Sequence, residues 1–373
     1  MGKPATPCQN ELPYGYWPKR INASSQPSIR NQMSDFLFYP GRKGFFAFRY
    51  PEVATALILL AFAIVFSFQT GAPFIVPDPE NTGFIGLRYS FPLGMGAIWL
   101  GISFLVYKRR QMRGEGDADI AARNKHHAIQ ALLYFVTFSA VMWLHFNIKL
   151  WGPLINPRRY DQFYQCIDEA LAPILDLAFE ARDWVAMRTG DHVDSWYLLT
   201  FAFMFFISFA WHLFRNREAL RNVFLAILFI EALGPLSYLI APAAGPFLYG
   251  NGQNLVALIN EQAMWEIRGL ILQQGPDWIA AYGDRYLSAG LAAMPSLHAG
   301  ASYIFVHYAA KYRTPLLPAY LVMYGWILIE AVASKWHYLI DLPAGIALAL
   351  FCIWLSNRFC QVEQEARPES FRA

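Results

Sequence analysis

The sequence predicts an all-α polytopic membrane protein with about eight transmembrane helices, and three observations lead to this class. Charged residues make up only 15% of the chain, whereas soluble domains average roughly 25%. Hydrophobic residues reach 56%. Several apolar stretches are nearly free of charge and long enough to cross a hydrocarbon layer of about 30 Å. A soluble fold could not bury so many stretches of this kind, so we expect them to lie in lipid.

The predicted spans alternate with polar loops, and the basic residues indicate which loops face the cytoplasm. The spans cover residues 53–68, 91–107, 128–146, 197–214, 223–240, 299–310, 316–333 and 342–355. An even number of spans places both termini on one side. Most of the 30 Lys and Arg residues lie in the N-terminal tail, in the 108–125 loop and in alternate loops after it. Because cytoplasmic loops collect basic residues, both termini are predicted to be cytoplasmic.

Four regions follow from this pattern. Residues 1–50 are expected to form an irregular cytoplasmic tail, and residues 51–123 two extra N-terminal spans with a cytoplasmic linker. Residues 124–358 contain the remaining six spans, and residues 359–373 form a cytoplasmic C-terminal tail. The first span is expected to serve as an uncleaved anchor. The net charge of +3 reflects the basic loops, so it gives no reason to expect a nucleic-acid partner.

Two outer segments have the apolar spacing of helices that lie along a membrane surface. Residues 162–185 place apolar side chains near helical spacing, with an interruption at Pro173. Residues 255–272 carry apolar side chains beside Glu261, Glu266 and Arg268. Both are predicted to be amphipathic helices parallel to the membrane.

The first candidate for chemistry is the stretch Met294-Pro295-Ser296-Leu297-His298, which opens an apolar span. Ser296 has the character of a helix N-cap, and the free N–H groups behind such a cap can bind a phosphate. His298 in the first helical turn could then protonate a leaving-group oxygen. The alternative is that Ser296 is a plain cap and His298 an interfacial polar residue.

The second candidate is His337 with Asp341, in the outer loop before the last span. Their four-residue spacing lets the carboxylate reach the imidazole over one turn. A carboxylate partner fixes the tautomer and leaves the other ring nitrogen free to attack phosphorus. The alternative is that Asp341 caps the last helix and His337 is an interfacial residue. The basic-loop rule puts His298, His337 and Asp341 on the same outer face, either the exterior or an organelle lumen.

These two motifs resemble those of the type 2 phosphatidic acid phosphatase superfamily, whose second motif reads Pro-Ser-x-His and whose third ends in His-x-x-x-Asp. The sequences Met-Pro-Ser-Leu-His and His-Tyr-x-x-Asp-Leu are similar to the motifs of one subgroup, the inositol phosphorylceramide synthases. The resemblance implies a six-helix catalytic core at 124–358. It also implies that His337 is the nucleophile, that Asp341 orients it, and that His298 acts as acid and then base. No metal and no other cofactor are implied.

The chain departs from the superfamily in its phosphate-binding cations. The superfamily carries Lys and Arg in its first motif and an Arg six residues before the nucleophilic His, where this chain has Ala331. The corresponding first-motif segment, 238–246, contains no cation. The available substitutes are Lys335, Arg285 and Arg268, which are expected to bind the substrate phosphate together with Ser296. The alternative for each cation is a snorkelling residue at the interface.

The predicted function is therefore that of a membrane phosphotransferase or phosphatase acting on a lipid phosphate or phospholipid head group. Water as the acceptor would make it a lipid phosphatase, and a lipid or polyol hydroxyl would make it a head-group transferase. The subgroup resemblance favours transfer. The rival from another class is a non-catalytic lipid-binding or transport protein that has kept the pocket, which the missing cations favour.

Overall fold

The computed structural model describes residues 38–39, 47–77, 85–249 and 255–366. Most of the predicted N-terminal tail lies outside these ranges. Within them the chain forms a short antiparallel pair, β1 (Phe38–Tyr39) and β2 (Ala47–Phe48), followed by helices. The helices are α2 (Pro51–Thr70), α3 (Ile85–Met112), α4 (Ala118–Ile155), α5 (Asp161–Ala170), α6 (Ala172–Thr189), α7 (Val193–Arg215), α8 (Arg217–Ser237), α9 (Leu255–Gln274), α10 (Pro276–Tyr286), α11 (Leu297–Lys311), α12 (Leu317–Ala333) and α13 (Asp341–Ala366), with short 3-10 turns η1 (Gly190–His192) and η2 (Pro246–Tyr249).

The predicted all-α polytopic class is confirmed, although fewer helices than expected have full spanning length. Within the described residues α2, α3, α4, α7, α8 and α13 are long and apolar enough to cross a membrane. The other two predicted spans form α11, with 15 residues, and α12, with 17 residues. At 1.5 Å per residue these helices are about 22 and 25 Å long, short of a hydrocarbon layer of about 30 Å.

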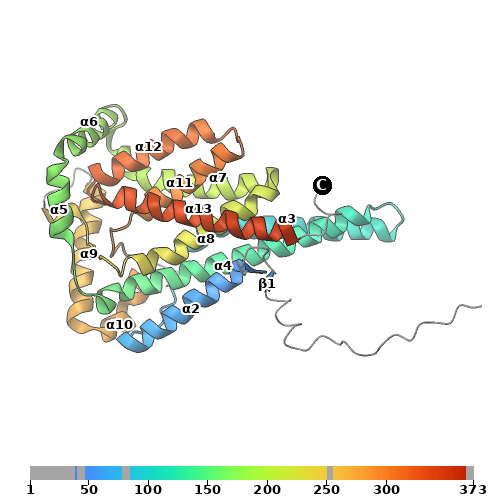
Figure 1. Ribbon diagram of the computed structural model, residues 1–373, viewed down its shortest axis with the longest axis horizontal. Helices are drawn as coiled ribbons and strands as arrows, with labels where there is room; N and C mark the ends of the chain where they lie inside the picture. Colours follow the sequence, from blue (N-terminus) through green and yellow to red (C-terminus); the bar gives the residue numbers. More distant parts are fainter. Residues whose placement is uncertain (1–37, 40–46, 78–84, 250–254, 367–373) are drawn as a thin grey trace, which may run out of the picture.

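The helices run back and forth between two ends of an elongated bundle (Figure 1). At one end the hairpin of α3 and α4 extends beyond the last turns of α13. At the other end α5, α9 and α10 lie against the ends of the long helices. We call this second end the covered end. The helix α9 matches the amphipathic segment predicted at 255–272, and the predicted interruption near Pro173 is the break between α5 and α6.

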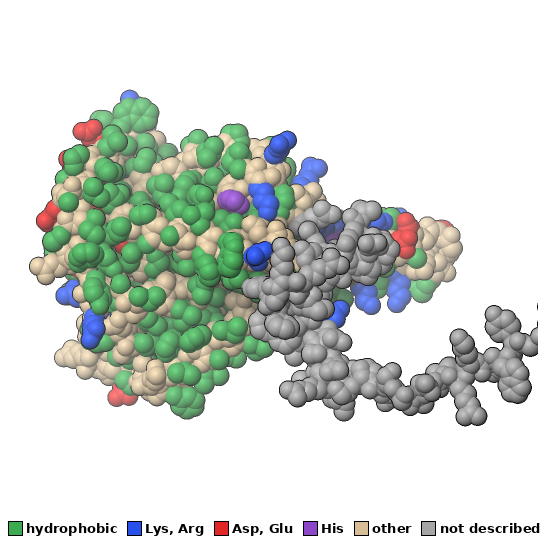
Figure 2. All heavy atoms as spheres, in the orientation of Figure 1, with side chains coloured by type: hydrophobic (Ala, Val, Ile, Leu, Met, Phe, Trp, Pro, Cys, Tyr) green, Lys and Arg blue, Asp and Glu red, His purple; other side chains and the backbone are tan. Residues whose placement is uncertain are grey.

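The surface of the bundle is apolar, as lipid contact requires. Hydrophobic side chains cover most of the face seen in Figure 2. The large apolar side chains of Leu57 and Phe68 on α2 are 59% and 85% exposed, and Trp99 on α3 is 50% exposed. Water would penalise this much exposed apolar surface, so the solvent of these helices is the hydrocarbon of a membrane.

Two glycines let α11 and α13 pack backbone against backbone, and this brings the two sequence motifs together. A Cβ atom added at Gly345 of α13 would overlap the carbonyl oxygen of Ser296. A Cβ atom at Gly300 of α11 would lie 2.6 Å from the carbonyl oxygen of Gly345. The N–H of Ser296 donates to the carbonyl oxygen of Asp341 at 3.0 Å. The starts of α11 and α13 are therefore fixed to one another at the covered end.

Candidate active site

His337 lies in the tight turn between α12 and α13, and its backbone N–H donates to the carbonyl oxygen of Ala331 at 2.9 Å. Its ring atom Nδ1 lies 2.8 Å from the carbonyl oxygen of Ala293 and 3.3 Å from Oδ2 of Asp341. A carbonyl oxygen can only accept, so Nδ1 carries the proton and Nε2 carries the lone pair. The predicted contact over one turn is present, and the turn holds the imidazole in the tautomer that a nucleophile at Nε2 needs.

Asp341 is fully buried and is the first residue of α13. Besides His337 its Oδ2 accepts the backbone N–H of Tyr338 at 2.9 Å. The carboxylate thus holds both the ring and the backbone of the turn that carries the ring. This arrangement limits the motion of His337 relative to α13.

His298 lies opposite His337. It belongs to the first turn of α11, and its ring is 4.4 Å from the ring centre of Phe201 and 5.0 Å from that of Tyr197, both on α7. The ring centres of His298 and His337 are 6.3 Å apart. The two imidazoles are therefore close enough for one phosphoryl group to contact both.

Ser296 is the N-cap of α11, as predicted. Its Oγ accepts the backbone N–H of Ala299 at 3.3 Å, and the side chain is fully buried. The hydroxyl is therefore used within the helix cap. The amides of Leu297 and His298 in the first turn have no acceptor inside the helix, so they are the donors that α11 offers to an anion.

The three cations proposed from the sequence lie on different elements. The Lys335 ammonium is 5.3 Å from the centre of the Phe179 ring on α6, and Arg285 is exposed in the last turn of α10. Arg268 is buried in α9 and donates to the carbonyl oxygen of Pro157 at 2.9 Å. Within the described residues none of them makes a hydrogen bond, ion pair or ring contact with His298 or His337. Their role in phosphate binding stays a prediction.

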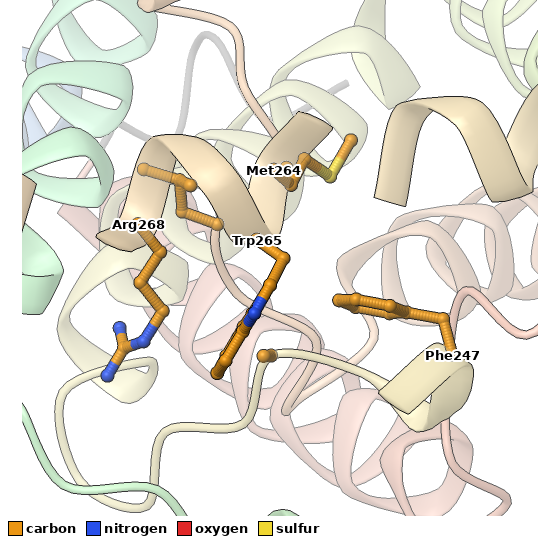
Figure 3. A pocket seen from close by; sticks show the side chains of 7 residues that line it. Phe247, Met264, Trp265 and Arg268 are labelled. Atoms are coloured by element: carbon orange, nitrogen blue, oxygen red, sulfur yellow. The ribbon is translucent and has the colours of Figure 1, made fainter. Parts of the chain in front are cut away.

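A small pocket beside Arg268 lies close to the turn that carries His337. It is lined by Ala244, Phe247, Met264, Trp265, Arg268, Gly290 and Leu291. The Trp265 indole lies between Arg268 and Phe247 (Figure 3), and the Arg159 guanidinium lies 4.6 Å from the ring centre of Trp265. A Cβ atom at Gly290 would be 4.0 Å from the Trp336 ring, so the pocket borders the residue that precedes His337.

The sequence reasoning missed two aspartates of α5 that hold the site loops. A single oxygen of Asp161 accepts three hydrogen bonds, from the N–H of Ala244 at 2.9 Å, the N–H of Gly245 at 3.0 Å and the Tyr338 hydroxyl at 3.0 Å. Asp168 accepts the N–H of Leu339 at 2.9 Å. The helix α5 therefore braces the His337 turn against the 241–245 loop. The available signal was the spacing of the two aspartates by seven residues, which places them on one helix face.

Burial changes the pKa values of two groups that link α5 to the His337 turn, the Asp168 carboxyl and the Tyr338 hydroxyl. It raises the pKa of the Asp168 carboxyl, and the Leu339 N–H and the Lys335 charge offset that rise only in part. Burial, reinforced by the negative charge of Asp161, raises the pKa of Tyr338 far above its ordinary value. The Tyr338 hydroxyl thus stays protonated at any physiological pH and remains a donor to Asp161.

Replacing Asp161 with Ala should lower turnover by about tenfold or more, because three donors lose their acceptor and each buried unsatisfied group costs about 1–3 kcal/mol. The matched control is Glu169→Ala on the same helix, where the exposed carboxylate accepts a hydrogen bond from the Gln165 side chain. That control should keep its activity and its melting temperature. Equal activity of the two variants in detergent would show that the brace does not position His337.

The fold and this site define a polytopic helical membrane protein whose covered end holds two histidines with ring centres 6.3 Å apart, one of them bound to a buried aspartate. The sequence profile of the PAP2 superfamily matches residues 175–355. That segment contains α7, α8, α11, α12 and most of α13, together with His298, His337 and Asp341. The match supports assignment of this part of the chain to the type 2 phosphatidic acid phosphatase superfamily, a group of phosphatases and phosphotransferases. No curated protein and no solved structure gives a significant match.

Proposed function

We propose that this protein is a lipid phosphatase or lipid head-group phosphotransferase that works through a phosphohistidine at His337. The observation that carries the proposal is the geometry of the two rings. The proton of His337 is held on Nδ1 between Ala293 and Asp341, which leaves Nε2 as the nucleophile, and His298 lies 6.3 Å away, measured between ring centres. The superfamily match to residues 175–355 supports the same chemistry.

In the first half-reaction Nε2 of His337 attacks phosphorus, and the bond from phosphorus to the leaving-group oxygen breaks. His298 gives that oxygen its proton, so the leaving group departs as a neutral alcohol. The imidazole of His337 becomes cationic when Nε2 binds phosphorus, and the Asp341 carboxylate at 3.3 Å stabilises that charge. The amides of Leu297 and His298 donate to the phosphoryl oxygens.

In the second half-reaction His298 accepts a proton from the acceptor hydroxyl. The acceptor oxygen then attacks phosphorus and the bond from phosphorus to Nε2 breaks, which restores His337 and leaves the proton on His298. Water as the acceptor gives hydrolysis, and a lipid or polyol hydroxyl gives transfer. We favour transfer, because the Met-Pro-Ser-Leu-His and His-Tyr-x-x-Asp-Leu phrasings resemble those of inositol phosphorylceramide synthases. The proposed substrate is a membrane lipid that enters at the non-cytoplasmic face, with both termini of the chain in the cytoplasm.

One set of observations favours a second candidate, a non-catalytic lipid-binding or transport protein. Ala331 occupies the place of the superfamily's third-motif Arg, and segment 238–246 contains no cation. Arg268 is bonded to Pro157 and Lys335 lies over Phe179. A protein that only binds or moves lipid would keep that ability after loss of His337.

The test is phosphate release from a panel of lipid phosphates by purified protein in detergent, with and without hydroxyl acceptors. The wild type should release phosphate or form an acceptor product, and His337→Ala should do neither. Product that forms only with an acceptor would establish transfer. Equal inactivity of both proteins across the panel, with lipid binding retained in both, would favour the non-catalytic candidate.

A further inference from the structure

Lys149, a lysine of α4 outside the family match, carries a charge near the candidate site. The predicted third span ended at residue 146, which left Lys149 in the outer loop, but α4 continues to Ile155 and contains it. The Lys149 side chain is half-buried. Its ammonium lies 5.8 Å from the ring centre of Tyr238 and 5.9 Å from that of Phe146.

The position of Lys149 matters because Tyr238 begins the segment where the superfamily carries its first phosphate-binding cations. That segment has no cation of its own in this chain. The Lys149 charge also lies within electrostatic range of His298 and of Glu231 on α8. A neighbouring helix therefore supplies a positive charge beside segment 238–246, which lacks one of its own.

Among the described residues, the Lys149 ammonium has no anionic partner in contact. It makes no hydrogen bond and no ion pair with any residue in the part of the chain that the structure describes, and its cation–π contacts are with the Phe146 and Tyr238 rings. Glu231, the nearest acidic neighbour on α8, is instead held by His145, whose Nδ1 lies 3.4 Å from the Glu231 carboxylate and 2.8 Å from the Glu231 carbonyl oxygen. A half-buried cation without a contacting anion, beside a site for phosphate, is suited to bind one.

Building on the proposed function, we infer that Lys149 binds a non-bridging oxygen of the substrate's phosphoryl group and replaces the missing first-motif cation. Tyr238 and Phe146 hold the aliphatic stem and the ammonium in place. The Glu231 carboxylate lowers the cost of burying the ammonium, and His298, which protonates the leaving-group oxygen, lies within electrostatic range of it. Lys149 thus contributes to the stabilisation of the phosphoryl group in both half-reactions.

The test measures two quantities on the full-length protein in detergent: the binding of orthovanadate, followed by tryptophan fluorescence, and kcat/KM for the best lipid phosphate in the panel. Lys149→Met should weaken orthovanadate binding by about tenfold or more and lower kcat/KM by about 10²- to 10³-fold. Lys149→Arg should stay within about tenfold of the wild type, since it keeps the charge. Lys311→Met, a matched change at the far end of α11 where Lys311 bonds Asn357, should match the wild type.

A double variant separates phosphate binding from simple charge balance. If Lys149 only neutralises Glu231, then Lys149→Met combined with Glu231→Gln removes both charges and restores activity and orthovanadate binding, which would overturn the inference. If Lys149 binds phosphate, the double variant folds with a normal melting temperature and stays as weak as Lys149→Met.

The two proposals can fail separately. A wild type that turns over lipid phosphates while Lys149→Met keeps its kcat/KM and its orthovanadate affinity would refute the role of Lys149 alone. A wild type that releases no phosphate from any lipid would refute the proposed reaction, and orthovanadate binding would still decide whether Lys149 holds a phosphate-like anion. If the wild type does not bind orthovanadate, the proposed role of Lys149 in phosphate binding is refuted as well.

Discussion

Replacing His337 with Ala should lower phosphoryl turnover by about 10⁴-fold or more, because no other group takes the place of the attacking Nε2 atom. The backbone of the turn should survive, since the His337 N–H keeps its bond to Ala331 and the Tyr338 N–H keeps its bond to Asp341. The measurement is the single-turnover rate with the best lipid phosphate, together with the melting temperature in detergent.

The matched control is His307→Ala, the same change on a half-buried histidine of α11 whose ring packs against Tyr303 and Tyr308. It lies about two and a half helical turns beyond His298 and should keep turnover within about twofold. The turnover of Asp341→Asn should lie between those of His337→Ala and His307→Ala. The amide oxygen still accepts hydrogen bonds from the turn but carries no charge to stabilise the phosphorylated ring. Residual turnover in His337→Ala equal to that in His307→Ala would exclude His337 as the nucleophile.

Replacing Gly345 with Ala should have the second largest effect on turnover, because it disturbs the packing of α11 against α13. The added methyl group would overlap the backbone carbonyl of Ser296, so α11 and α13 would have to separate. That separation strains the bond from the Ser296 N–H to Asp341 and moves His298 away from His337. We expect overpacking to cost about 1–3 kcal/mol and turnover to fall by about 10²-fold, since small displacements of catalytic groups cost that much.

The control for this variant is Gly325→Ala on the neighbouring helix α12, where an added Cβ atom would meet nothing within 4 Å. Alanine has the higher helix propensity, so this variant should be as stable as the wild type or slightly more stable. Thermal unfolding in detergent and turnover should be measured for both variants. If Gly345→Ala behaved like Gly325→Ala, the close packing of the two motif helices would not control the site.

The sequence was sufficient for the fold class and for the meeting of the two motifs. The long apolar stretches indicate that lipid surrounds the helices. The order of the spans brings the starts of α11 and α13 to the same end of the bundle. The contact between His337 and Asp341 followed from their four-residue spacing, and Figure 1 shows the covered end where α13 begins. Two of the eight predicted spans are shorter than the others, because α11 and α12 end after 15 and 17 residues.

The parts that sequence reasoning missed depend on partners far away in the chain. No role was predicted for Asp161 or Asp168, because the backbone N–H groups that bond them, near residues 244 and 339, lie far away in the chain. Lys149 was missed for a different reason. The predicted span ended at residue 146, before Lys149, whereas α4 continues to Ile155 even with Pro153 in its last turn.

The most direct test of the central claim is to trap the phosphorylated enzyme. Wild-type protein mixed with a lipid phosphate carrying radioactive phosphorus, and quenched within one turnover, should carry label that is stable to base and labile to acid, as a phosphoramidate is. Mass spectrometry should place it on the peptide that contains His337, and His337→Ala should carry none. Turnover in the wild type without any labelled His337, or equal labelling of the His337→Ala protein, would contradict the account.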